Sequence, residues 1–156
     1  MPPGRASGTS PAVDITLTEA EEDPALEAMF RAIEAFNAPA AGQTDSKPVN
    51  LVVRRPGETE PCGGLFGHTL YRWFFVRLLF LPADLRRGGL GATLLRRAEA
   101  EAVARGCIGI HLDTFSFQAR PFYEKMGFEV FGTIDDHPIG GHRFFMQKLL
   151  TRAPIL

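Results

Sequence analysis

The chain has 156 residues, of which 45% are hydrophobic and 22% are charged, and its net charge is −1. This length and composition predict a single soluble globular domain with a hydrophobic core of its own. The nearly neutral charge excludes a broad electrostatic attraction to nucleic acid or to an anionic membrane, so any anion-binding site must be local.

The ends of the chain differ from its middle in composition. Residues 1–12 are rich in Pro, Gly and Ser and lack the apolar core of a signal peptide. We therefore expect a flexible tail there, a single domain over residues 13–150 and a C-terminal tail over residues 151–156. The longest apolar run, Trp73–Leu81, is far shorter than the roughly 20 residues that span a bilayer. The two cysteines show neither metal-ligand spacing nor a disulfide framework. These features predict a cytoplasmic protein without a metal centre.

The first predicted elements are a weak strand and an amphipathic helix. Asp14–Thr18 alternates weakly and is interpreted as a strand. Asp23 is a suitable N-cap and Pro24 a suitable first helical residue, and apolar residues then recur at helical spacing. Pro39 is expected to end this helix, with a loop over residues 38–48.

The remaining pattern is one of strands that outnumber helices. Strands are predicted over residues 49–54, 63–70, 71–81, 107–114, 128–134 and 143–148, and helices over residues 90–105 and 119–126. The run 71–81 is apolar on both faces except for two arginines, as expected of a central strand. The helix 90–105 joins two strands that should be parallel.

A glycine-rich turn between the strand 71–81 and the next helix carries the strongest functional signal. Glycines allow backbone N–H groups to face a ligand, and the helix dipole adds positive potential at the same point. The turn therefore predicts a phosphate site, with the alternative of a tight turn that binds nothing. The candidate contacts are Arg86, Arg87, Gly88, Gly89, Leu90, Gly91 and Ala92.

The glycine spacing narrows the choice of phosphate ligand. A P-loop needs Lys after its last glycine, and Ala92 stands there instead. A dinucleotide fingerprint needs a third glycine where this chain has Leu94. The pattern Arg-x-x-Gly-x-Gly does fit, at Arg86, Gly89 and Gly91. It resembles the pyrophosphate-binding segment of the GNAT superfamily of acyl-CoA-dependent N-acetyltransferases.

A second segment strengthens this resemblance. GNAT proteins commonly carry the pattern A-x-x-(F/L)-Y-E-K-x-G-F after the strand that corresponds to residues 107–114. It is matched by Ala119, Phe122, Tyr123, Glu124, Lys125, Gly127 and Phe128. One position departs from the family, since Ser116 stands where an Asn often holds the pantetheine arm. The resemblance covers roughly residues 50–150. It implies an α/β (α+β) fold with a mixed, mostly antiparallel sheet of six to seven strands, flanked by helices and with splayed central strands.

The resemblance also implies where acetyl-CoA, the acetyl donor, binds. The pantetheine arm would enter between the splayed strands and bond to backbone groups near Leu79, Phe80 and Leu81, while the pyrophosphate would rest on N–H groups between Arg87 and Ala92. Backbone N–H groups near Leu79 could stabilise the oxyanion. Tyr123 matches a tyrosine that protonates the leaving thiolate in many relatives, with aromatic packing as its alternative role.

The sequence does not identify the general base or the amine acceptor. His68, His111, Asp113 and the pair Asp136-His137 are the base candidates, and water is an alternative. Acceptor recognition is expected from residues 23–47 and from the loop 135–141. We therefore expect direct acetyl transfer, in a ternary complex, to a primary amine of a small molecule or peptide. The alternatives are a non-catalytic acyl-CoA sensor or scaffold and a nucleotide-binding protein of another fold. No nucleic-acid or membrane partner is expected, and a homodimer is compatible with the resemblance.

Overall fold

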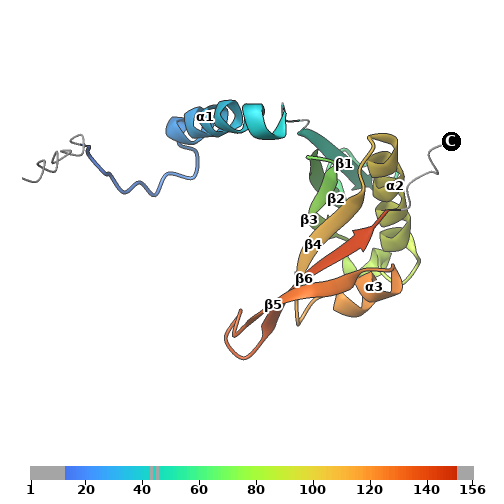
Figure 1. Ribbon diagram of the computed structural model, residues 1–156. Helices are drawn as coiled ribbons and strands as arrows, with labels where there is room; N and C mark the ends of the chain where they lie inside the picture. The colour runs from blue at the N-terminus through green and yellow to red at the C-terminus, as the bar shows by residue number, and fades with distance from the viewer. Residues whose placement is uncertain (1–12, 43, 45, 151–156) are drawn as a thin grey trace, which may run out of the picture. The chain divides into compact units, whose positions relative to one another are not determined.

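The structure is a computed structural model that describes residues 13–42, 44 and 46–150. The two predicted tails lie outside these residues. The chain divides into two compact units, Met1–Phe36 and Asn37–Leu156. All six strands of the described chain belong to the second unit, together with helices α2 and α3 (Figure 1). None of the helices in the described ranges combines the length and the apolar character needed to cross a membrane.

Helix α1, Pro24–Ala41, begins where the sequence predicts. The carboxylate of Asp23 accepts the N–H of Ala25 at 2.9 Å and so caps the helix. The predicted end at Pro39 is wrong, because the helix continues for two residues. A proline in the last turn removes only one helical hydrogen bond, and its fixed φ suits a helix. The strand predicted over residues 14–18 is also wrong, since this exposed segment has no regular structure.

The second unit contains a six-stranded mixed sheet. Its strands are β1 Lys47–Arg54, β2 Pro61–Leu70, β3 Trp73–Phe80, β4 Gly109–Phe115, β5 Glu129–Asp135 and β6 His142–Leu149, in the spatial order β1-β2-β3-β4-β6-β5. The β3–β4 pair is parallel and the other four pairs are antiparallel. β3 begins two residues later than predicted, because Tyr71 and Arg72 have φ of 47° and 63° and form the turn after β2. The predicted mostly antiparallel sheet is confirmed.

Both helices of this unit cover the same side of the sheet (Figure 1). Helix α2, Leu90–Ala104, buries one apolar face made of Leu94, Leu95, Ala98 and Ala102. Gly106 follows its end with φ of 78°, the left-handed conformation typical of a C-cap. A short 3₁₀ helix, η1 Ala83–Leu85, precedes it, and α3 is Arg120–Lys125. The largest fully buried side chains are Phe74, Leu65, Leu95, Ile110, Leu112 and Met146.

Truncating Phe74 to alanine is expected to destabilise the protein by about 3–5 kcal/mol, because this ring is fully buried beneath α2 and leaves a cavity. Phe117→Ala is the matched control. That ring is 69% exposed, so its loss is expected to cost less than about 0.5 kcal/mol. Urea unfolding of the two variants measures the difference. Equal losses would contradict the assignment of Phe74 to the core.

Candidate functional site

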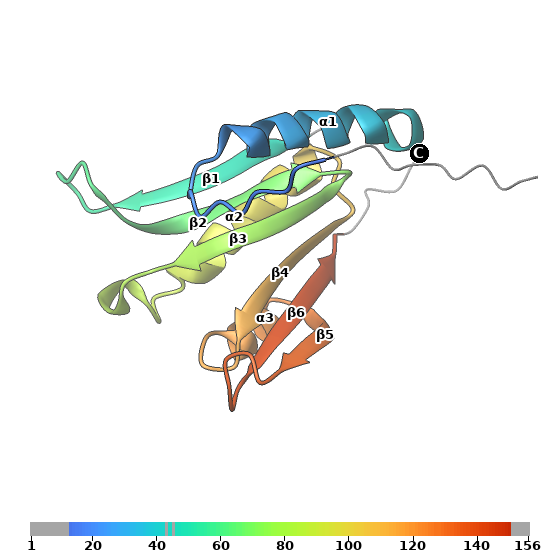
Figure 2. The same cartoon turned by 90° about the vertical axis from the view of Figure 1, so that its left-hand side faces the viewer.

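The central strands β3 and β4 separate halfway along their length. They pair from Trp73 opposite Gly109 to Val76 opposite Leu112, and no further, although both strands continue. Figure 2 shows them diverging beyond this point. Among the described strands, residues 77–80 of β3 thus have β2 as their only neighbour. This splay leaves backbone N–H and C=O groups of a central strand free to bond to a ligand.

A β-bulge lies at the start of the splay. Gly67 of β2 pairs with Val76 of β3 whereas the adjacent Phe66 pairs with Leu78, so Arg77 is the extra residue. A bulge shifts the alternation of side chains by one position. Buried positions therefore change from Phe74 and Val76 before the bulge to Leu79 and Leu81 after it. Of the three residues whose backbone is predicted to bind the pantetheine arm, Leu79 and Leu81 pack their side chains on the core and Phe80 is 49% exposed.

The glycine-rich loop follows directly from the splayed end of β3. Gly89 is the N-cap of α2 and has φ of 83°, and Arg87 also has a left-handed φ of 66°. No side chain caps this helix, so its first N–H groups are available to an anion. A Cβ on Gly88 or Gly89 would have no heavy atom within 4 Å, so the space over the loop is open. A Cβ on Gly91 would meet the ring of Phe122 at 3.5 Å, which shows that this glycine lies against α3.

Two charged contacts hold the loop in place. The Nε of Arg86 donates to the carbonyl of Leu81 at 2.7 Å and so closes the connection between β3 and α2. The guanidinium of Arg55, from the β1–β2 turn, pairs with the carboxylate of Asp84 at 2.8 Å, and this hydrogen bond lowers the pKa of Asp84. Both contacts fix the backbone in front of the helix. Arg87, by contrast, is exposed at the tip of the loop.

Tyr123 presents its ring to the core. The residue is 7% exposed, and its ring packs edge-on against Phe122 at 5.2 Å and Phe128 at 5.8 Å between centroids. Burial, and secondly the negative charge of Asp113, raises the pKa of Tyr123 to about 12. Within the described part of the chain no hydrogen-bond partner is found for its hydroxyl. The hydroxyl is therefore protonated at neutral pH and available to a ligand.

This raised pKa predicts an alkaline loss of stability. A tyrosine in the unfolded chain ionises near pH 10, whereas folded Tyr123 keeps its proton to about pH 12. Its contribution to stability is therefore complete below pH 10 and is lost as the pH rises toward 12. Chemical denaturation at pH 8, 9, 10 and 11 (values chosen about the ordinary tyrosine pKa) is expected to show this decline in the wild type. The free energy of unfolding should decline less with pH in Tyr123→Phe. An equal decline in the two proteins would contradict the raised pKa of Tyr123.

The turn between β4 and α3 is built on residues that the sequence did not single out. The buried Thr114 donates its hydroxyl to the side-chain carbonyl of Gln118 at 3.3 Å, and that carbonyl also accepts the N–H of Phe115 at 3.0 Å. Ser116, predicted to contact the pantetheine arm, accepts the N–H of His142 at 3.1 Å. Its hydroxyl thus ties the turn to β6, and a role toward the cofactor stays a prediction.

The base candidates differ in how their polar atoms are engaged. Asp113 is held by Arg143, whose Nη2 and Nε lie 2.7 and 2.8 Å from one carboxylate oxygen. Asp136 accepts the N–H of Gly140 at 3.2 Å and has φ of 54°, so it shapes the hairpin turn. His137 packs edge-on against Phe115. His68 of β2 and His111 of β4 both contact the ring of Phe75, on the side of the sheet opposite α2 and α3.

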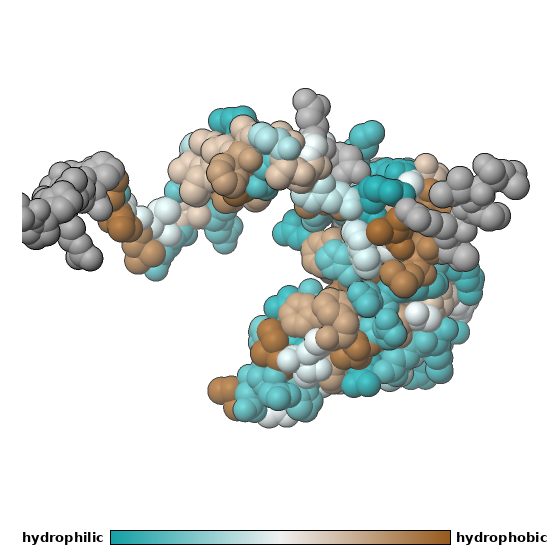
Figure 3. Space-filling view, viewed as in Figure 1, coloured by the Kyte–Doolittle hydropathy of each residue, from teal (hydrophilic) through white to brown (hydrophobic). Residues whose placement is uncertain are grey.

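The β5–β6 hairpin loop, predicted to contact the acceptor, does not present a pair of free carboxylates. Asp135 binds the Nδ1 of His142 at 2.9 Å, and Asp136 has the turn-forming role just described. The loop does expose apolar surface, since Ile139 is 95% exposed. In Figure 3 apolar side chains gather at this end of the sheet. The other predicted acceptor segment, residues 23–47, includes α1 and stays a prediction.

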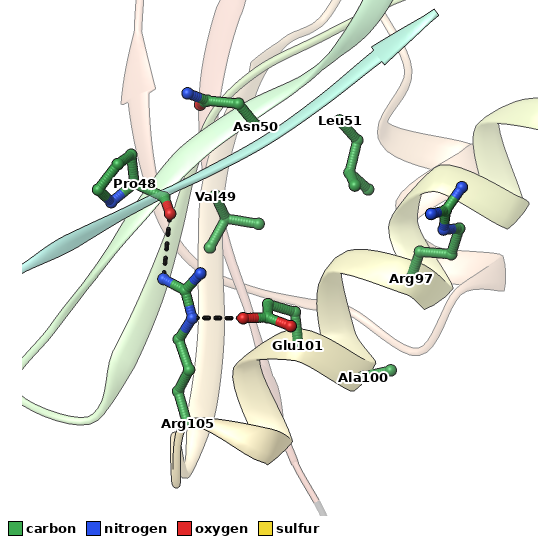
Figure 4. A pocket seen from close by; sticks show the side chains of 8 residues that line it. All are labelled: Pro48, Val49, Asn50, Leu51, Arg97, Ala100, Glu101 and Arg105. Carbon is green, nitrogen blue, oxygen red and sulfur yellow. Dashed lines mark hydrogen bonds and ion pairs between the residues drawn. The ribbon is translucent and has the colours of Figure 1, made fainter.

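One cavity lies away from the splay. It has a volume of about 650 Å³ and opens between the edge strand β1 and the C-terminal half of α2 (Figure 4). Arg105 spans it, with hydrogen bonds to the carbonyls of Lys47 and Pro48 and an ion pair to Glu101 at 2.7 Å. These contacts fasten α2 to the edge of the sheet, and no residue of the glycine-rich loop lines the cavity. The described residues contain no group of three metal-ligating side chains.

Comparison with known proteins identifies this arrangement. The sequence profile of the Acetyltransferase (GNAT) family matches residues 13–128, more than half of the chain. The chain belongs to this family. The GNAT resemblance of the residues 86–91 and 119–128 is thereby confirmed, as are the mixed fold with splayed central strands and the assignment to the acyltransferases.

Individual GNAT relatives cover most of the chain. An acetyltransferase of Agrobacterium fabrum is 34% identical over 136 residues, which cover 87% of this chain and 98% of the relative. A Blasticidin-S acetyltransferase of Streptomyces morookaense is 44% identical over 82 residues, covering 52% of this chain and 60% of that protein. The crystal structure of an acetyltransferase from Agrobacterium tumefaciens matches with a TM-score of 0.82 at 31% identity, and covers 88% of this chain and 100% of that one.

Proposed function

We propose that this GNAT enzyme transfers the acetyl group of acetyl-CoA to a primary amine of a small molecule or peptide in the cytoplasm. The observation that carries the proposal is the splay of β3 and β4 directly beside the uncapped start of α2. The splayed half of β3 offers unpaired backbone N–H and C=O groups to a ligand arm that contains amides, and the start of α2 offers N–H groups to a diphosphate. Acetyl-CoA contains both groups.

The donor is proposed to lie along these two features. Its pantetheine amides would bond to the backbone of β3 between Arg77 and Leu81, the part that lacks β4 as a neighbour. Its pyrophosphate would accept hydrogen bonds from N–H groups between Arg87 and Ala92, where the loop is open and positively polarised. Because the binding is through backbone atoms, the side chains of Leu79 and Leu81 remain free to pack on the core.

The reaction is a direct displacement at the thioester carbonyl. The neutral amine attacks the carbonyl carbon, a C–N bond forms, and the carbonyl oxygen becomes an oxyanion that backbone N–H groups near Leu79 would stabilise. The C–S bond then breaks and its electron pair goes to sulfur. We assign Tyr123 as the donor to that sulfur, because its hydroxyl is protonated at neutral pH and has no described protein partner. The products are the amide and CoA thiol.

Of the two proposed classes of acceptor, a small molecule is favoured over a peptide. The 44% identical relative from Streptomyces morookaense is named for acetylation of blasticidin S, a small molecule. The side of the sheet opposite α2 and α3 carries aromatic rings of β3 and β4, among them Trp73 and Phe75, which suit an acceptor with flat or apolar parts. Phe75 stands one residue before the last paired residue of β3, and Trp73 stands at the start of the paired stretch.

A coupled binding and turnover experiment tests this function. Acetyl-CoA binding is measured by calorimetry, and thiol release is measured with a panel of polyamines, amino sugars, nucleoside antibiotics and peptides with free amino groups. We expect saturable binding of acetyl-CoA and amine-dependent thiol release with at least one member, together with mass-spectrometric detection of the acetylated amine. Binding without turnover on any amine would favour the non-catalytic sensor or scaffold. Tight binding of ATP or NAD without competition by CoA would contradict the assignment of the loop.

A further inference from the structure

One imidazole on the side of the sheet opposite α2 and α3 lies one residue pair before the splay. His111 of β4 stands opposite Phe75 of β3, and the next pair, Val76 with Leu112, is the last before the strands separate. Its ring stacks on Phe75 with 4.9 Å between centroids and meets the edge of Trp73 at 6.1 Å. The two rings therefore hold the imidazole one residue pair before the strands separate.

The nitrogens of this imidazole are not engaged by the protein. No described residue forms a hydrogen bond with either ring nitrogen of His111, in contrast to Asp113, which Arg143 holds, and His142, which Asp135 holds. A basic nitrogen without a protein partner keeps its lone pair available to a ligand. Of the two base candidates on β4, Asp113 is held by Arg143, whereas His111 has no described hydrogen bond at its nitrogens and lies one pair before β3 and β4 separate.

The surroundings of His111 favour its neutral form. Burial, and secondly the neighbouring His68 of β2, lowers its pKa below the ordinary value of 6.5, and Asp113 on its own strand opposes this shift. The charge of Asp113 is itself offset by Arg143. On β6 the facing residue is Gln147, whose amide donates to Glu129 of β5. The two β3 rings that contact it, Trp73 and Phe75, carry no charge. His111 is therefore a base, not an acid, at neutral pH.

We propose that His111 is the general base of the acetyl transfer. This proposal rests on the function proposed above and names the group that takes the proton from the attacking amine. As the C–N bond forms, nitrogen becomes positive and loses its proton to the imidazole, while the sulfur that leaves takes a proton from Tyr123. His111 then returns its proton to water, and Tyr123 regains one from water, so that atoms and charge balance over a cycle.

The test compares His111→Gln with the matched control His68→Gln, in which the adjacent imidazole on the same face is lost. The kcat/KM of each variant is measured from pH 5 to 9 (a span chosen about the ordinary imidazole pKa) with an amine that the wild type acetylates. We expect His111→Gln to lose about 10²–10⁴-fold and His68→Gln to lose less than about tenfold, with acetyl-CoA affinity unchanged in both.

The pH dependence separates a base from a structural side chain. The ratio of wild-type to His111→Gln activity cancels the ionisation of the amine itself, because both enzymes use the same acceptor. We expect this ratio to be flat at neutral and alkaline pH and to fall toward one as the pH drops through the lowered pKa of His111. Added imidazole is expected to restore activity to His111→Ala but not to Tyr123→Phe.

The outcomes are distinct. Three results with an active wild type would overturn the role of His111: a ratio of wild-type to His111→Gln activity that does not change with pH, no rescue of His111→Ala by imidazole, or an equal loss of activity in His68→Gln. Each of these would leave the proposed acetyltransferase function intact. A wild type that binds acetyl-CoA but acetylates no amine overturns the proposed function, and the role of His111 with it. If His111→Gln unfolds at the assay temperature, His111→Asn is measured in the same way, and His111→Ala with imidazole decides.

Discussion

Replacing Gly88 by aspartate is expected to weaken acetyl-CoA binding by tenfold or more while leaving the stability of the protein unchanged. A side chain on Gly88 would have no heavy atom within 4 Å of its Cβ, and φ is not in the left-handed region, so the fold tolerates it. The new carboxylate would stand at the loop where the pyrophosphate is proposed to bind. A tenfold loss corresponds to about 1.4 kcal/mol, which a like-charge contact near a helix N-terminus readily supplies.

Gly88→Asn is the matched control for this change. Asparagine has the same shape as aspartate without its charge, so the difference between the two variants isolates electrostatics from bulk. Calorimetry with acetyl-CoA at low and high salt is the measurement, and the gap between Asp and Asn is expected to narrow as salt screens the charge. Unchanged affinity in Gly88→Asp would show that the loop is a strand-to-helix turn that binds no phosphate.

Tyr123→Phe is expected to lower kcat about 10²-fold or more and to leave the acetyl-CoA dissociation constant within about twofold. Phenylalanine keeps the ring that packs between Phe122 and Phe128, so the core is preserved. What is lost is the hydroxyl, which has no described protein partner and is held protonated by its buried surroundings. A loss of kcat with unchanged affinity is the signature of an interaction made in the transition state.

The other tyrosine of the chain supplies the control. Tyr71 lies in the turn between β2 and β3, at the opposite end of β3 from the splay. Tyr71→Phe removes a hydroxyl in the same way and is expected to leave kcat unchanged. Steady-state thiol release with a saturating amine measures both variants. If Tyr123→Phe turns over like the wild type, Tyr123 is an aromatic packing residue and the thiolate leaves without its help.

The sequence predicted those parts of the site that are continuous along the chain. The loop from Arg86 to Ala92 and the segment from Ala119 to Phe128 each place several functional positions within a few residues, where glycines and a tyrosine are recognisable by type. The order of strands and helices around them followed from hydrophobic period and turn residues. Two predictions that failed concerned the N-terminal elements. Pro39 costs only one hydrogen bond near a helix end, so the helix continues past it. A strand at residues 14–18 would need a partner strand, and the weak alternation of its residues does not specify one.

The features that depend on register were beyond sequence reasoning. The bulge at Arg77 exists because Val76 and Leu78 pair with neighbouring residues of β2, and nothing in the apolar run marks the extra position. The place of His111 depends on its pairing with Phe75, a residue 36 positions earlier in the chain. The sequence spacing placed His111 and Asp113 on one face of the same strand. The structure shows that Arg143 binds the carboxylate of Asp113, whereas no described residue bonds to the nitrogens of His111. Long-range pairing thus decides which of these two side chains is held by another residue.

Acetyl-CoA is proposed to bind along the splayed half of β3 and the start of α2. Amide hydrogen exchange, followed by mass spectrometry with and without CoA, tests this binding mode most directly because the proposed contacts are made by backbone N–H groups. Slower exchange is expected in residues 77–81 and 87–92, with little change in β1 and in the cavity between β1 and the C-terminal half of α2. Protection confined to β1 and that cavity, with exchange in the splay and the loop unaltered by saturating CoA, would contradict the account.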